Sequence, residues 1–92
     1  MQSIITDNQN CYLCGGIASD THHCLMGNKR LLCDKYGLTV RLCRKCHMMI
    51  HNPRTDQEKG LQTYLKRVAQ TTFEDQIGNR DDFIKIFGRN YL

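Results

Sequence analysis

The second half of the chain carries apolar side chains that recur every three to four residues. Apolar positions at this spacing share one face of a helix, so they predict an amphipathic α-helix. This helix is expected to begin at the capping-box pattern Thr55-Asp56-Gln57-Glu58 and to end near Gly78. The positions that define its apolar face are Leu61, Tyr64, Leu65, Val68, Ala69, Phe73 and Ile77.

A shorter helix is expected close to the C-terminal end of the sequence. Asn79 is a suitable N-cap for it, and Gly88 is a suitable residue to end it. Its apolar residues are Phe83, Ile84, Ile86 and Phe87. Because the two helices hold most of the large apolar residues, we expect them to form a core beneath the first half of the chain.

The first half has shorter patterns. Residues 1–10 are polar apart from one isoleucine pair and are expected to form an N-terminal arm. A short strand is expected over Thr21–Leu25. The alternation of apolar and polar residues over Leu38–Leu42 is typical of a half-buried strand.

Two short helices are expected in the same half. The first covers Lys29–Tyr36, with Asn28 as its N-cap and Gly37 after its last turn. The second begins after Cys46 and is limited to one or two turns by Pro53. Together the elements predict one small α+β domain, organised as an arm (1–10), a ligand-rich part (11–54) and a C-terminal helical extension (55–92).

All six cysteines and all four histidines lie between residues 11 and 51. Two Cys-x-x-Cys pairs, separated by 28 residues, have the spacing of a closed tetrahedral zinc site. A chain of 92 residues is near the lower limit at which a core alone stabilises a domain, so a structural zinc is a plausible staple. The predicted zinc ligands are Cys11, Cys14, Cys43 and Cys46, whereas Cys24 and Cys33 are expected to be buried free thiols.

The histidines predict a second, open metal site. His47 and His51 are four residues apart, so on a helix they present two imidazoles to one ion. One member of the His22-His23 pair would complete a three-ligand site, and the other would be free to act as a general base. The alternatives are that His47 or His51 only caps or packs, or that His47 is a spare ligand of the structural zinc.

The positive charge is concentrated around these ligands. Residues 25–54 carry seven basic side chains and one acidic one, whereas residues 55–92 carry six of each. This distribution favours a polyanionic partner such as nucleic acid, and a solvated basic surface is the alternative. The candidate phosphate contacts are Arg30, Arg41, Arg44 and Lys45.

The order Cys-x-x-Cys, His-His, Cys-x-x-Cys-His resembles the His-Me finger (HNH) endonucleases that carry a treble-clef-like zinc knuckle. The resemblance implies a small zinc-stapled ββα-metal core with C-terminal helices. By position, His22 is implied to bind the catalytic ion and His23 to act as the general base. His47 and His51 are implied to complete the metal site.

The chain is also similar to small phage proteins related to the recombination-enhancement (Ref) nuclease. The similarity lies in Lys35–Leu38 leading to Leu42-Cys43, and in the final stretch Arg80–Leu92. One departure from the HNH pattern is its middle asparagine, which is absent from the stretch 36–42.

These resemblances imply a metal-dependent endonuclease that hydrolyses DNA phosphodiester bonds and leaves 5′-phosphate and 3′-hydroxyl ends. The implied cofactors are one structural Zn²⁺ and one catalytic divalent ion (Zn²⁺, Ni²⁺, Mn²⁺ or Mg²⁺). DNA is the implied partner, in the cytoplasm of a bacterial host, with a homodimer and a recombination protein as further candidates.

Two alternatives stay open at this point. A non-catalytic zinc-knuckle module would bind nucleic acid or a protein and would tolerate replacement of the histidines. A disulfide-bonded secreted mini-domain is disfavoured, because the first residues have no apolar segment typical of a secretory signal. No apolar run approaches the length of a membrane span, so no membrane partner is expected.

Overall fold

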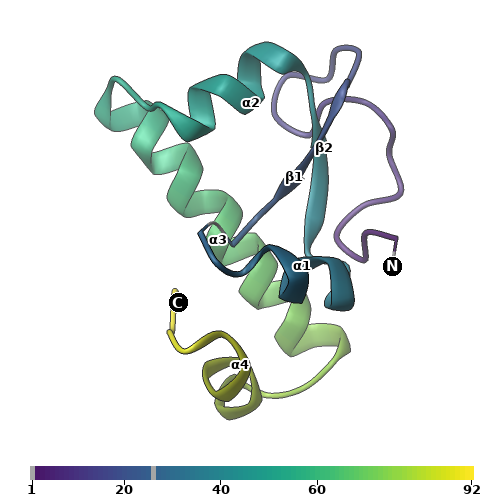
Figure 1. The fold of residues 1–92 in the computed structure, drawn as a ribbon, viewed down its shortest axis with the longest axis vertical. Helices are drawn as coiled ribbons and strands as arrows, with labels where there is room; N and C mark the ends of the chain where they lie inside the picture. The colour runs from purple at the N-terminus through teal and green to yellow at the C-terminus, as the bar shows by residue number, and fades with distance from the viewer. Residues whose placement is uncertain (1, 26) are drawn as a thin grey trace.

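The computed structural model describes residues 2–25 and 27–92, so Met1 of the predicted arm lies outside the described part. Within it, four helices and a two-stranded sheet form a small α+β fold (Figure 1). The elements in chain order are β1 (Asp20–His23), α1 (Arg30–Tyr36), β2 (Thr39–Leu42), α2 (Arg44–His51), α3 (Asp56–Gln76) and α4 (Arg80–Phe87). The α+β class predicted from the sequence is confirmed.

The two strands are antiparallel, with Asp20 opposite Leu42 and His22 opposite Val40. Successive side chains of a strand point to opposite faces of a sheet. Asp20 and His22 therefore share one face, which is the face that α2 covers. The ring of His22 lies 5.4 Å from that of His47 on α2, measured between ring centroids.

The turn from α1 into β2 holds the N-terminal arm. Gly37 ends α1 with φ 73°, a left-handed conformation that favours glycine. Its carbonyl accepts a hydrogen bond from the Ile4 backbone N–H at 2.9 Å, and the Ser3 hydroxyl donates to the Thr39 carbonyl. The N-cap position of α1 falls on Lys29, so the predicted Asn28 cap is wrong.

The helix predicted to follow Cys46 begins earlier, at Arg44. Its N-cap is Cys43, whose Sγ accepts a hydrogen bond from the Cys46 N–H at 3.4 Å. A cysteine is not a usual N-cap, and the pattern that predicts helix starts therefore missed this one. The second Cys-x-x-Cys pair is thus the first turn of α2.

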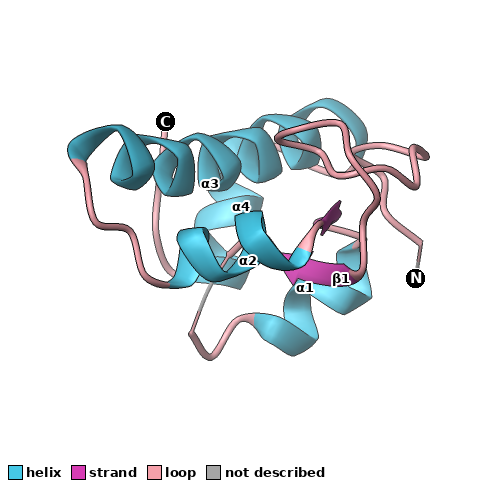
Figure 2. Cartoon of the chain, turned by 90° about the horizontal axis from the view of Figure 1, so that it is seen from above, coloured by secondary structure: helices cyan, strands magenta, loops and turns pink. Residues whose placement is uncertain are grey.

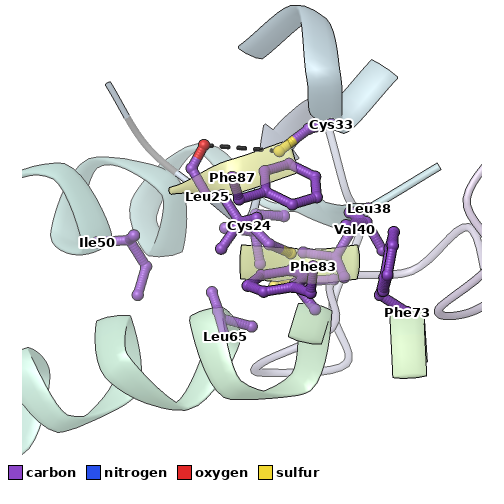
Figure 3. Packing of buried hydrophobic residues seen from close by; sticks show 13 residues of the cluster. Cys24, Leu25, Cys33, Leu38, Val40, Ile50, Leu65, Phe73, Phe83 and Phe87 are labelled. Atoms are coloured by element: carbon purple, nitrogen blue, oxygen red, sulfur yellow. Dashed lines mark hydrogen bonds between the residues drawn. The ribbon is translucent and has the colours of Figure 1, made fainter. Parts of the chain in front are cut away.

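The two predicted C-terminal helices are confirmed and supply the aromatic core. The long helix α3 runs along one edge of the molecule. The helix α2 and the sheet lie together next to one side of α3 (Figure 2). Phe73 of α3 and Phe83 and Phe87 of α4 are fully buried and pack together beside Leu65, Leu38 and Val40 (Figure 3). Tyr36 of α1 packs edge-on against Phe73 and Phe87, so α1 contributes to the same core.

Both C-terminal helices have side-chain caps. Asn79 and Asp82 form a complete capping box at α4. At α3 the Thr55 hydroxyl accepts from the Glu58 N–H at 3.1 Å, but the Glu58 carboxylate accepts from the Arg54 N–H instead of closing the box on Thr55. Only half of the predicted capping box is therefore formed at α3.

We expect Gly37→Ala to destabilise the protein more than Gly88→Ala. Both glycines have a left-handed φ, which costs an alanine roughly 1–2 kcal/mol. A Cβ at Gly37 would also lie 2.5 Å from the Gln2 carbonyl oxygen and 3.2 Å from the Ile4 nitrogen, whereas the nearest atom at Gly88 is the Lys29 Nζ at 3.8 Å. Urea denaturation of both zinc-loaded variants measures the difference, and equal losses would show that docking of the arm contributes nothing.

Candidate metal centres

The first candidate centre is a cluster of the four knuckle cysteines. Cys11 and Cys14 lie in the loop before β1, and Cys43 and Cys46 lie at the start of α2. Their Sγ atoms are all within 4.8 Å of one another, and those of Cys14 and Cys43 are 3.8 Å apart. Two sulfurs bound at ~2.3 Å to one tetrahedral zinc would be separated by ~3.8 Å. The donor set and its spacing therefore fit a structural zinc.

The two knuckles repeat one local geometry. In each, the N–H of the second cysteine points at the Sγ of the first, at 3.5 Å in the first knuckle and 3.4 Å in the second. Burial raises the pKa of Cys11, but hydrogen bonds from the backbone of Cys43, Cys14 and Leu13 outweigh it, and the pKa falls to about 6. A thiolate is the form that binds zinc, and Cys11 favours it. The pKa of Cys46 is raised instead, first by burial and then by its hydrogen bonds with the other three cysteines. At Cys14 the backbone N–H of Gly16 lowers the pKa, but hydrogen bonds with Cys11 and Cys43 outweigh it and raise the pKa.

Cys24 and Cys33 lie away from this cluster, in the hydrophobic core. Both side chains are buried, and burial raises the pKa of each thiol. The Cys33 thiol donates to the Leu25 carbonyl at 3.5 Å, shown as the dashed line in Figure 3. Both cysteines are free thiols, as the sequence predicted.

The second candidate centre consists of His22 from β1 and His47 and His51 from α2. One ring nitrogen of each lies within 4.8 Å of the others, and the Nε2 atoms of His47 and His51 are 3.2 Å apart. Two nitrogens at ~2.0 Å from one tetrahedral ion would be ~3.3 Å apart. The α2 helix thus brings its i and i+4 imidazoles to a spacing that suits a shared ion.

His22 gives the most direct indication that this cluster is a binding site. Its side chain is 1% exposed, and neither ring nitrogen has a hydrogen-bond partner among the residues that the structure describes. A buried polar atom without a partner is costly and rare in a native protein. Burial, followed by the nearby imidazoles of His47, His51 and His23, lowers the pKa of His22 to about 4. The ring is therefore neutral at physiological pH and offers a lone pair to an ion.

Asp20 is a residue of the candidate site that the sequence pattern did not indicate. Its Oδ2 lies 2.9 Å from His47 Nδ1, and Arg44 donates to both carboxylate oxygens at 3.0 and 3.3 Å. The hydrogen bond from His47 lowers the pKa of Asp20 to about 2 against a smaller effect of burial, with Arg44 adding to the decrease. Since the carboxylate only accepts, the hydrogen of His47 lies on Nδ1 and leaves Nε2 free for metal.

A signal for Asp20 was present in the pattern of spacings. Asp20 precedes His22 by two residues on a strand, so both side chains point the same way. Arg44 and His47 are three residues apart on a helix and share a face. The sequence does not show that this face of β1 packs against this face of α2, and the contacts of Asp20 depend on that packing.

His23 lies at the edge of the histidine cluster. A pocket of about 240 Å³ is lined by the three clustered histidines together with His23, Arg30, Thr21, Leu25 and Gly27. His23 is on the opposite strand face from His22, and its Nε2 lies 2.8 Å from Oδ1 of Asp34 on α1. The predicted base and the predicted metal ligands therefore share one pocket, which we call the histidine pocket.

The four predicted phosphate contacts are not gathered in one place. Arg30 lines the histidine pocket, and Arg44 is paired with Asp20 beside it. Arg41 donates to the Thr21 hydroxyl at 3.1 Å and faces a neighbouring groove formed with the N-terminal arm. Lys45 lines a third hollow at the far side of α2, next to Met48 and Met49. Of the four, Arg30 is the residue that lines the pocket with the histidines.

Comparison with protein-family models, curated proteins and solved structures finds no significant match to this chain. None of the helices in the described part is both long and apolar enough to cross a membrane.

We expect Cys46→Ala to remove zinc and Cys24→Ala to retain it. Both changes delete a thiol, but only Cys46 belongs to the knuckle cluster. Wild-type protein should contain about one tightly held zinc per chain, which elemental analysis measures after dialysis against a weak chelator. Equal zinc content in the two variants would contradict the assignment, whatever the effect of either change on stability.

The depressed pKa of His22 predicts acid sensitivity of the protein without metal at the histidines. Between about pH 6.5 and 4 the unfolded chain binds a proton at this position and the folded chain does not. The free energy of unfolding should therefore fall as the pH is lowered through this range, by up to roughly 3 kcal/mol from this residue. Urea denaturation at several pH values, for wild type and His22→Gln, measures it. The difference between them isolates His22 from the acid sensitivity of the cysteine cluster, and parallel curves would contradict the prediction.

Proposed function

We propose that the protein is a metal-dependent endonuclease that hydrolyses phosphodiester bonds of DNA at the histidine pocket. The observation that carries this proposal is His22, buried with two unpartnered ring nitrogens and facing two further imidazoles. A fourth histidine and an arginine line the same pocket. Three ligands, a separate base and a cation for phosphate are the groups that metal-assisted phosphodiester hydrolysis requires.

The arrangement of elements supports an HNH-type, treble-clef-like reading of the fold. The antiparallel pair β1–β2 is followed directly by α2, so that a strand residue and two helix residues converge as in a ββα-metal motif. The cysteine cluster joins the loop before β1 to the start of α2. In this chain the helix α1 is inserted between the two strands.

The ion would be held by His22, His47 and His51. When bound, it would supply Lewis-acid stabilisation of the negative charge that develops on the phosphate and the departing oxygen. Three imidazoles favour a borderline ion such as Zn²⁺, Ni²⁺ or Mn²⁺ over Mg²⁺, which prefers oxygen ligands. Asp20 holds His47 in the orientation that directs Nε2 to this position.

Two other side chains of the pocket, outside the ligand set, carry the remaining roles in the reaction. His23 accepts a proton from the attacking water and acts as general base, because its imidazole lines the pocket but lies outside the three-histidine ligand set. The guanidinium of Arg30 binds a nonbridging phosphate oxygen, for which its planar donor geometry is suited. Neither role reads the base sequence, so cleavage depends on the backbone of the substrate.

A further basic residue, Arg41, extends the proposed phosphate contacts beyond the histidine pocket. Arg41 faces the neighbouring groove, which shares Thr21 with the histidine pocket, so the nucleic-acid backbone can continue there. The same proposal includes a role in phage or host recombination. It also includes a recombination protein as partner and a homodimer that cuts both strands.

The test is a plasmid-nicking assay with Mg²⁺, Mn²⁺, Ni²⁺ and Zn²⁺, for wild type and His23→Ala. We expect metal-dependent nicking by the wild type and a loss of at least about a hundredfold in the variant, the usual contribution of a general base. Zinc content and circular dichroism should not change, because His23 is outside both ligand sets.

Two other results are informative. Equal nicking by His23→Ala would exclude this residue as the base. One zinc per chain and no cleavage with any ion would favour the non-catalytic zinc-knuckle module, in which case binding of DNA should survive replacement of His22, His47 and His51.

A further inference from the structure

We propose that Asp34 is a positioning residue that holds the hydrogen of His23 on Nε2, so that Nδ1 is the nitrogen presented to the histidine pocket. The inference rests on the proposed function, in which His23 is the general base. It adds a residue that neither the sequence pattern nor the metal ligands indicate, and it names the nitrogen that accepts the proton.

The contact itself is direct. His23 Nε2 and Asp34 Oδ1 are 2.8 Å apart, which is a short hydrogen bond between side chains eleven residues apart in the chain. A carboxylate can only accept, so the hydrogen of this bond belongs to the imidazole nitrogen. A neutral imidazole carries one ring hydrogen. When it lies on Nε2, the lone pair that remains for chemistry is on Nδ1.

Both partners are held by the backbone and the core. His23 is the last residue of β1 and lies opposite Thr39 in the sheet. Asp34 follows Cys33, whose buried thiol donates to the Leu25 carbonyl and whose own carbonyl accepts from the Leu38 N–H at 2.9 Å. The short helix α1 is thus tied to the strand that carries His23. The Asp34 carboxylate can therefore fix both the rotation and the tautomer of the His23 ring.

The exposure of the pair argues against a mainly structural role. The Asp34 side chain is 51% exposed and that of His23 is 18% exposed. A pair in which one partner is half exposed contributes modestly to folding stability. The His23 ring also lines the histidine pocket, so the consequence of losing the contact falls on the orientation of a reactive group. A base whose imidazole is oriented by a third group is a recurrent arrangement in hydrolytic sites.

The first measurement does not depend on cleavage. Histidine ¹⁵N NMR of the zinc-loaded protein at neutral pH distinguishes the two ring tautomers, and the signals missing from His23→Gln identify those of His23. We expect the Nε2–H form in wild type and in the control Asp75→Asn, which changes another exposed aspartate. In Asp34→Ala we expect a mixture of both tautomers. A wild-type Nδ1–H form, or no change in Asp34→Ala, would overturn the proposal.

The second measurement is kinetic. With the ion that supports nicking, Asp34→Ala should lower kcat by roughly tenfold to a hundredfold and leave KM nearly unchanged, because the residue does not touch the substrate. Asp34→Glu should recover part of the loss, and Asp75→Asn should behave as wild type. In a His23→Ala background the Asp34 change should have no further effect, and an equal loss there would overturn the proposal.

Failure of the proposed function is distinguishable from failure of this inference. A wild type that cleaves no substrate with any ion contradicts the endonuclease. The tautomer of His23 in wild type and Asp34→Ala still decides, by itself, whether Asp34 positions the ring.

Discussion

The architecture of the first half depends on the contact between two cysteine pairs that are 28 residues apart in sequence. The large aromatic core residues Phe73, Phe83 and Phe87 come from the C-terminal helices, whereas Cys11 is the one fully buried side chain among residues 2–19. Four thiolates around one ion can join segments that hydrophobic burial alone would leave loosely connected. The cysteine cluster is the constraint that places the start of α2 beside the loop leading into β1, and both candidate centres follow from that placement.

The histidine cluster is unfavourable for folding stability when no ligand is bound. Burying the ring of His22 without partners is unfavourable in the absence of an ion, and the acidic Asp20 is occupied in holding His47 and Arg44. Such an arrangement is typical of a site that gives up stability for ligand binding, which is what the proposed metal site would require. The aromatic core and the capped helices α3 and α4 supply stability that does not depend on the histidines.

Much of the fold was predictable because its determinants are local. Periodicity and caps located α3 and α4, and the ligand spacings indicated both clusters. The start of α2 was missed because a sulfur of Cys43 caps it, and the N-cap of α1 was misplaced by one residue. Asp20 and Asp34 were missed for a different reason. An isolated acid has no distinctive spacing, and its role depends on which histidine the folded chain places against it.

Cys46 and His47 are consecutive residues on the first turns of α2, yet they belong to different clusters. If each cluster held an ion, each ion would restrain the helical segment on which the other depends. By thermodynamic linkage, an ion at the cysteines would change the ion affinity of the histidines by the same factor by which an ion at the histidines changes that of the cysteines. Occupancy of the cysteines would raise the affinity of the histidines, and the histidine ion would in turn slow loss of the structural zinc. Scarcity of zinc would thus act on the histidine pocket twice, once through its own occupancy and once through the helix that the two ions share.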